Sequence, residues 1–265
     1  MGVTAQRNLS IAASFAYDLP IETQIPLIAQ AGFNYISPGG SLKHLDYLDK
    51  AARKSFTQLL AQNGLKLDTI HGPLTGKFDV ETLNRTAEAA SEFGAGVIVV
   101  HCSPFEITES EMTQRLPQLQ KDCRELEKIY RATGVRFALE NMVPGPASTL
   151  IVRALKDSDP ACIGFCYDSS HDQVDGPRTF ALLEELKDRL ISVHLSDRIK
   201  PFTDHVIPWE GFIHWDELCG ILKRCNIRFP LLLEVATTFS EEKDPEQFLK
   251  MAYQAGCKLW DKIFS

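Results

Sequence analysis

Four polar residues of this chain each end a short apolar run: Glu140 after RFAL, Asp168 after IGFCY, His194 after LISV and Glu234 after PLLL. Such runs are typical of buried strands in a parallel sheet. Three carboxylates and one imidazole form a ligand set that divalent metals accept. A single strand-end carboxylate is more often a helix cap, but several buried acids in one cleft repel each other unless a cation neutralises them. We therefore predict that the four residues bind a divalent metal ion.

The histidines are distributed in the same way. Five of the seven end an apolar run or closely follow one: His71, His101, His171, His194 and His205. A lone histidine at such a place is more often a hydrogen-bonded structural residue than a ligand. Only His44 and His214 lie elsewhere, however, and we expect the other five on one rim of the fold.

Eight strands alternating with helices would position these residues. The runs that we interpret as strands are 9–14, 33–37, 67–71, 97–101, 136–140, 163–168, 190–194 and 230–234. Apolar residues recur at helical spacing over 111–130, 179–189, 212–224 and 246–262. Glycines fall between a helix and the next strand, where left-handed C-caps are common: Gly32, Gly64, Gly94 or Gly96, and Gly134. Pro26 falls inside the first predicted helix, where a proline removes one backbone hydrogen bond.

Eight such units without a long linker predict an α/β fold, a single (β/α)8 TIM barrel domain over residues 1–265. That length fits a barrel of roughly 250 residues. A doubly wound sheet with a nucleotide site would need a glycine-rich loop after the first strand, and SFAYDLP has no glycine. In a barrel, the carboxyl ends of the strands form the active site.

Composition bears on location and partners. Lys and Arg total 28 against 35 Asp and Glu, a net charge of −7, which gives no sign of a polyanion-binding surface. No apolar stretch approaches the roughly 20 residues that span a bilayer, and the first residues lack the apolar region of a signal peptide. Seven cysteines without a CxxC pair predict reduced thiols. We expect a cytoplasmic protein with no membrane partner.

The motifs around these residues resemble the xylose isomerase-like TIM-barrel superfamily over essentially the whole chain. That superfamily includes sugar (phosphate) isomerases and epimerases, inosose-processing enzymes and AP endonucleases of the endonuclease IV type (AP endonuclease family 2). The matching stretches are HGPL at His71, VVHCSP at His101, ALENM at Glu140, CYDSSH at Asp168, VHLSD at His194, HVIPWEGFIHWDEL from His205 and LLLEV at Glu234.

For the epimerase-like branch, the resemblance implies that Glu140, Asp168, His194 and Glu234 hold one divalent metal: Mn²⁺, Co²⁺, Mg²⁺ or Zn²⁺. It implies that both glutamates transfer protons on opposite faces of the substrate and that His171 contacts substrate. In the endonuclease branch, residues matching the other rim histidines help to bind up to three zinc ions. Here Thr203 stands where that branch has an aspartate, and Trp209 where it has a glycine. These departures favour single-metal sugar chemistry over cleavage of nucleic acid.

We therefore expect a metal-dependent isomerase or epimerase of a small sugar, sugar phosphate or inosose that acts through an enediolate. The alternatives are a zinc-dependent AP endonuclease, an inosose dehydratase-like lyase and a non-catalytic sugar- or metal-sensing barrel. The expected substrate contacts are His71, His101, His171, His205, Trp209 and Lys200, and Arg198 is a further candidate. Phe15, Phe105 and Phe239 are expected near the pocket or in packing. Phosphorylation of the substrate and homo-oligomerisation stay open.

Overall fold

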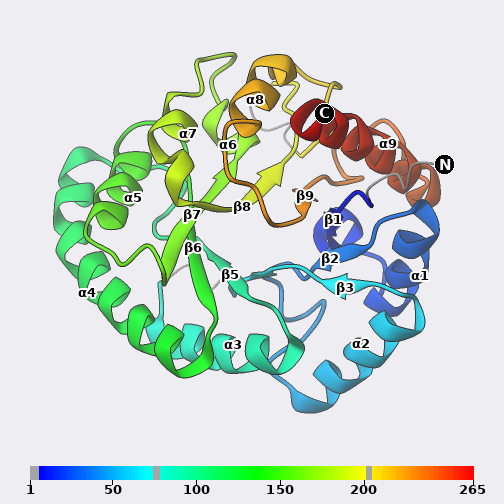
Figure 1. Ribbon diagram of the computed structural model, residues 1–265, viewed down its shortest axis with the longest axis horizontal. Helices are drawn as coiled ribbons and strands as arrows, with labels where there is room; N and C mark the ends of the chain where they lie inside the picture. The colour runs from blue at the N-terminus through cyan, green and yellow to red at the C-terminus, as the bar shows by residue number, and fades with distance from the viewer. Residues whose placement is uncertain (1–5, 74–77, 201–204) are drawn as a thin grey trace.

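The computed structural model describes residues 6–73, 78–200 and 205–265. Their strands form one parallel sheet in the order β3-β2-β1-β9-β8-β7-β6-β5-β4. The strands are β1 (Leu9–Ala12), β2 (Tyr35–Ser37), β3 (Lys66–Leu67), β4 (Ile70–His71), β5 (Val97–Val100), β6 (Arg136–Glu140), β7 (Ile163–Asp168), β8 (Leu190–Leu195) and β9 (Leu231–Leu233). Figure 1 shows the sheet curled inside a ring of helices. The predicted α/β TIM barrel is confirmed.

The barrel closes within the third predicted strand. We expected one strand over 67–71, and the structure divides this stretch into β3, which pairs with β2, and β4, which pairs with β5. Between them, the Ser37 hydroxyl donates to the Thr69 carbonyl at 2.9 Å, in place of a backbone ladder bond. Backbone bonds from Asp68 to Ile36 and from His71 to Pro38 continue the contact on both sides of the break. The two edges of the sheet therefore meet.

Helices surround the sheet, and most of them cover its outside (Figure 1). They are α1 (Ile21–Ala31), α2 (Lys50–Gln62), α3 (Val80–Phe93), α4 (Glu109–Thr133), α5 (Pro146–Lys156), α6 (Ser169–Asp172), α7 (Ala181–Leu186), α8 (Trp215–Leu222) and α9 (Pro245–Phe264). Short 3-10 turns occur at Ala13–Ala16 and Lys187–Arg189. The long helix α4 starts two residues before the predicted 111–130, because Thr108 and Glu111 form a reciprocal capping box.

Two local features differ from the simplest expectation. Helix α1 runs through Pro26 without ending there, so burial of its apolar face offsets the lost hydrogen bond. Of the two glycines considered after α3, Gly94 rather than Gly96 takes the left-handed cap, with a φ of 80°. A residue with a β-carbon would be strained in that conformation.

Two apolar cores stabilise the barrel. The larger lies between strands and helices, and a small separate cluster consists of Val99, Ala138, Cys166 and Ile191. Val99 on β5 is paired in register with Ala138 on β6, and Cys166 lies on β7. Cys166 is paired in register with Glu140, so the small cluster packs against the strand ends that carry the site.

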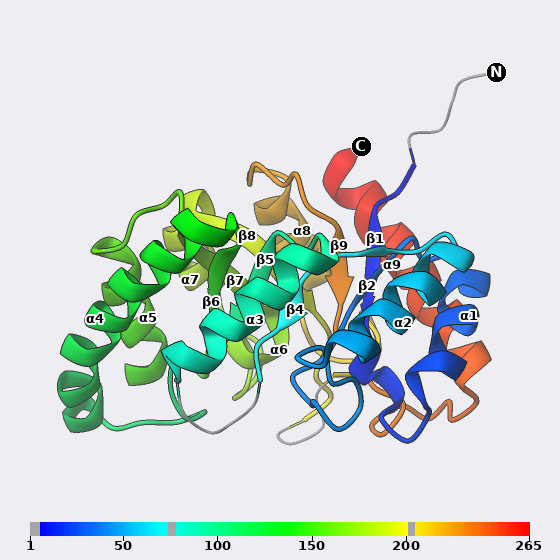
Figure 2. The same ribbon diagram turned by 90° about the horizontal axis from the view of Figure 1, so that it is seen from below.

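The remaining whole-chain expectations concern thiols and membranes. All seven cysteines are free thiols, as predicted. Among the described residues, no helix has the length and apolar character to cross a bilayer. In Figure 2 the loop that follows β5 lies at the lower edge, while the end of α9 lies at the upper edge.

Candidate metal centre

The four predicted metal ligands come from consecutive strands of the sheet. Asp168 on β7 is paired in register with His194 on β8, and His194 is paired with Leu232, two residues before Glu234. Glu140 ends β6. Residues two apart on a strand point to the same face, so all four side chains converge. Their potential ligand atoms lie within 4.8 Å of one another.

His194 lies at the centre of this set. Its Nδ1 atom is 3.0 Å from Glu140 Oε1 and 2.6 Å from Glu234 Oε2. Neighbouring ligands of a six-coordinate ion with bonds near 2.1 Å are separated by roughly 3 Å. The spacing of these donor atoms therefore suits a cation between them.

Asp168 supplies a buried oxygen aimed at no hydrogen-bond donor. Its Oδ1 atom accepts bonds from the Ser170 hydroxyl at 2.9 Å and from the His171 backbone at 2.7 Å. Its Oδ2 atom is shielded from solvent and has no hydrogen-bond partner in the described part of the chain. An unsatisfied buried carboxylate oxygen is costly, and a metal ion is the kind of partner that would satisfy it.

The charges of the set depend on one another. Burial raises the pKa of Glu140, but the positive charges of His194 and His101 outweigh this and hold it well below its ordinary value. Burial also raises the pKa of Glu234, but the positive charge of His194 outweighs this and lowers the pKa to about 2. Burial lowers the pKa of His194, whereas the nearby Cys166, Glu234 and Glu140 raise it well above the ordinary value. Burial raises the pKa of the Cys166 thiol to about 12, so the two carboxylates are the negative charges that act at neutral pH. A site that favours a proton on His194 in this way also favours a cation.

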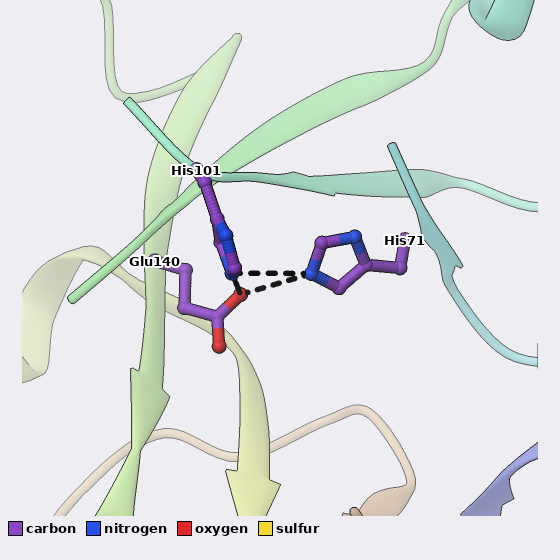
Figure 3. Close-up of side chains that lie close together, drawn as sticks. All are labelled: His71, His101 and Glu140. Atoms are coloured by element: carbon purple, nitrogen blue, oxygen red, sulfur yellow. Dashed lines mark hydrogen bonds and ion pairs between the residues drawn. The ribbon is translucent and has the colours of Figure 1, made fainter. Parts of the chain in front are cut away.

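A second cluster shares Glu140, as Figure 3 shows. His71 Nε2 and His101 Nε2 lie 3.4 and 3.1 Å from Glu140 Oε2 and 3.3 Å from each other. His71 Nδ1 lies 2.9 Å from the Gly72 carbonyl. A carbonyl only accepts hydrogen bonds, so Nδ1 carries the proton and the Nε2 of a neutral ring is left as an acceptor. Ligands of tetrahedral zinc with bonds near 2.05 Å are also roughly 3.3 Å apart.

Asp168, His171 and His205 form a third group with ligand atoms within 4.8 Å. His171 Nδ1 lies 2.9 Å from the Asn141 carbonyl. The Asn141 side chain also accepts from the Asp168 backbone at 2.7 Å and donates to its carbonyl at 2.9 Å. Asn141 thus positions two site residues, and sequence reasoning missed it although it directly follows Glu140. The predicted departure at Thr203 lies outside the described residues.

The loop after β8 is fixed by Asp197, a second residue that the sequence analysis missed within VHLSD. Asp197 is fully buried. Its Oδ1 accepts from the Arg198 and Ile213 backbones, and its Oδ2 accepts from the Trp209 backbone at 2.9 Å and from Trp215 Nε1 at 2.6 Å. The same loop holds His205 and Trp209 at φ values of 56° and 75°. Asp197 therefore stabilises a strained segment that carries a site histidine.

Asp197→Asn is expected to lower the free energy of unfolding by roughly 2–4 kcal/mol. The N–H₂ end of the new amide would replace one carboxylate oxygen and would face two N–H donors without accepting a bond from either. Urea unfolding measures this loss. Asp188→Asn is the matched control, since Asp188 is exposed before β8. This substitution should leave the free energy of unfolding unchanged. Equal stability of the two variants would contradict the role given to Asp197.

The other expected contacts have different surroundings. Trp209 is half-buried against Trp215, with Lys258 Nζ 3.7 Å above its ring, and its contact with substrate stays a prediction. Lys200 is exposed after β8. Arg198 is buried, and its Nε donates to the Ser170 carbonyl at 3.0 Å.

Of the three phenylalanines considered near the pocket, Phe15 is fully buried and stacks on Phe248. Phe105 and Phe239 are exposed in loops after β5 and β9. The Phe105 ring meets His171 edge-on, with ring centres 4.9 Å apart. Phe105 therefore borders the histidine cluster, whereas Phe15 belongs to the core.

Asp68, at the break between β3 and β4, has a buried carboxyl oxygen that no pattern in the sequence predicts. Its Oδ2 atom is shielded from solvent, although the residue as a whole is half-buried. Burial raises the pKa of Asp68 to about 7, against lowering contributions from Ser10 and His194.

This shift predicts a pH-dependent stability. A carboxyl group whose pKa rises from roughly 3.9 unfolded to about 7 folded binds its proton more tightly in the native state. Its contribution to stability is therefore lost as pH rises between those values. As pH rises from 5 to 8 in the presence of chelator, the wild type should lose stability that Asp68→Asn keeps. The difference in the free energy of unfolding should therefore shift by roughly 2–3 kcal/mol in favour of the variant. Urea unfolding at both pH values tests this, and parallel pH profiles would contradict it.

Comparison with known proteins places this site in a family. A family model described as xylose isomerase-like TIM barrel matches residues 25–253. The uncharacterised protein y4fM of Sinorhizobium fredii is 26% identical over an alignment of 259 residues, and the match covers 82% of this chain and 82% of that protein. A solved D-tagatose 3-epimerase-like protein has a TM-score of 0.76 at 18% identity and covers 97% of this chain and 100% of its own. The IOLI protein with a bound zinc atom has the same TM-score and identity, covering 97% and 99%.

The structural matches share the barrel fold, and the family match spans most of the barrel described above. The chain therefore belongs to the xylose isomerase-like TIM barrel family.

Proposed function

We propose that this protein is a metal-dependent isomerase or epimerase of a small sugar or inosose. The observation that carries the proposal is the convergence of Glu140, Asp168, His194 and Glu234, with donor atoms within 4.8 Å of one another and an unsatisfied Asp168 oxygen. The similarity to a D-tagatose 3-epimerase-like protein supports this class of reaction, and the zinc atom of the IOLI protein supports metal binding. Location in the cytoplasm stays a prediction.

The four residues would hold one divalent cation, Mn²⁺, Co²⁺, Mg²⁺ or Zn²⁺. Such an ion polarises a substrate carbonyl and its neighbouring hydroxyl as a Lewis acid. The protein's own part is to move the proton of the carbon between these groups. One glutamate removes it to give an enediolate, and the other returns a proton, from the opposite face in an epimerisation.

The two glutamates differ in access. Glu234 has a side chain that is 17% exposed, whereas that of Glu140 is 1% exposed and is surrounded by His71, His101 and His194. Both carboxylates have lowered pKa values and are weak bases. Glu234 is therefore the better placed to meet substrate first, and the substrate's C–H bond must be strongly acidified for either glutamate to act. His171 and His205 would orient substrate hydroxyl groups.

The proposal is tested by deuterium exchange. The protein is loaded with Mn²⁺, Co²⁺ or Mg²⁺ in D₂O and given a panel of ketoses, aldoses and inososes, and the metal is removed before NMR. We expect label at a carbon next to a carbonyl in at least one compound. If none of the compounds takes up deuterium with any of the metals, the proposal is overturned. Loss of water without deuterium exchange into the substrate would indicate the dehydratase-like alternative.

The four-residue set shares Glu140 with one histidine group and Asp168 with the other. Three neighbouring ligand groups favour one second candidate, a zinc-dependent endonuclease acting at abasic sites. Against it stand the net charge of −7 and the Trp209 departure. An oligonucleotide with one abasic site, incubated with the protein and zinc, distinguishes the two. Cleavage at stoichiometric zinc together with unchanged sugars would favour the endonuclease.

A further inference from the structure

A pocket extends outward from the metal centre between α3 and α4. It has a volume of about 800 Å³, and His71 and His101 are among the residues that line it. The four predicted metal ligands do not line it. Two of its lining residues contact one of these ligands: the Nε2 atoms of His71 and His101 lie 3.4 and 3.1 Å from Glu140 Oε2. A ligand atom beside the histidines would therefore lie next to the proposed centre.

The size of the pocket exceeds what one sugar ring requires. Pockets of roughly 300–1,000 Å³ enclose whole drug-sized ligands, and this one lies near the upper end of that range. The proposed reaction takes place at the metal ligands, outside the pocket. The pocket is thus additional space, available to a part of the substrate that does not react.

The walls of the pocket have two kinds of surface. Its apolar floor consists of Leu83, Val100, Leu119 and Met142. Phe105, which is 41% exposed, also lines the pocket, and its ring packs against that of His171. Apolar area with an aromatic edge suits the C–H face of a ring.

The opposite wall is polar. Arg115, Gln118 and Asp122 line it from one face of α4, at spacings of three and four residues. Gln118 Nε2 donates to Asp122 Oδ1 at 2.8 Å, which fixes the amide beside the carboxylate. This wall therefore offers both hydrogen-bond donors and acceptors, which can pair with the hydroxyl groups at the edge of a sugar ring. The α3 and α4 helices that frame the pocket are neighbours in both ribbon views (Figures 1 and 2).

We infer that the pocket between α3 and α4 binds a second ring, joined through a glycosidic bond to the sugar that reacts at the metal centre. The substrate class is then a glycoside rather than a free monosaccharide. The inference rests on the proposed function for the position of the first ring, since the second ring fills the space beyond His71 and His101.

Saturation-transfer NMR tests the inference without turnover. The Mg²⁺-loaded protein is mixed with phenyl β-D-glucopyranoside or methyl β-D-glucopyranoside, and contact with the phenyl protons is recorded together with both dissociation constants. We expect strong saturation of the phenyl protons and at least ten-fold tighter binding of the phenyl compound. Gln118→Trp should fill the pocket, abolish that saturation and remove the ten-fold preference.

Gln114→Trp is the matched control, because Gln114 is exposed on the same helix and does not line the pocket. It should keep the wild-type result. Equal affinity for the two glucosides, or phenyl saturation that survives in Gln118→Trp, would overturn the inference. This outcome is distinct from a failure of the proposed function, which would appear as absent deuterium exchange whether or not the phenyl ring is bound.

Discussion

Glu234→Gln is expected to lower the rate of deuterium exchange roughly 10²–10⁴-fold, the usual contribution of a positioned acid or base. Gln has the size of Glu but no carboxylate to accept a proton. The Glu234 Oε2 atom lies 2.6 Å from His194 Nδ1, so the substitution also removes a negative charge from the metal set. We therefore expect a lower kcat together with weaker metal affinity, measured by exchange kinetics at several metal concentrations.

Glu241→Gln is the control for this prediction, because Glu241 is an exposed carboxylate in the loop that follows the same strand. It should keep the wild-type rate. The fold of both variants is checked by circular dichroism and urea unfolding. An exchange rate in Glu234→Gln equal to that of the wild type at saturating metal would remove Glu234 from the mechanism.

Metal binding is expected to stabilise the protein strongly. A ligand at 1,000 times its dissociation constant adds about 4 kcal/mol to the free energy of unfolding if it binds only the native state. For a chain of this size, that corresponds to a rise in Tm of roughly 8–16 °C. Thermal unfolding in excess Mn²⁺ and in chelator measures the difference.

Asp168→Asn should abolish this rise. The Asn Oδ1 atom can still accept the bonds from Ser170 and His171 that begin α6, so the fold is retained. An amide nitrogen would replace Oδ2, which has no hydrogen-bond partner among the residues that the structure describes, and an amide N–H₂ group does not bind a cation. Without metal, the variant should be as stable as the wild type or more so, since a buried charge is removed.

Asp188→Asn, at an exposed site before β8, should keep the full metal-dependent rise in Tm. If Asp168→Asn showed the same rise as this control, Asp168 would not be a ligand. Chelator that left the wild-type Tm unchanged would contradict metal binding by the four-residue set.

Much of this architecture follows from local patterns in the sequence. Apolar runs ending in Glu140, Asp168 and His194 mark strands, because a strand buried on both faces reads as a continuous apolar segment. Parallel strands joined by helices place all their carboxyl ends on one side. The sequence therefore determined the barrel, its order of elements and the set of side chains that meet at its rim.

Only the tertiary structure decided how those side chains act on one another. The break at Asp68 and Thr69 depends on the Ser37 hydroxyl from a neighbouring strand. The different access of Glu140 and Glu234 depends on which histidines surround each carboxylate. The pocket between α3 and α4 is lined by residues as far apart in the chain as His71 and Met142. Distances, burial and enclosed volume arise from contacts between segments far apart in the chain, and no local pattern encodes them.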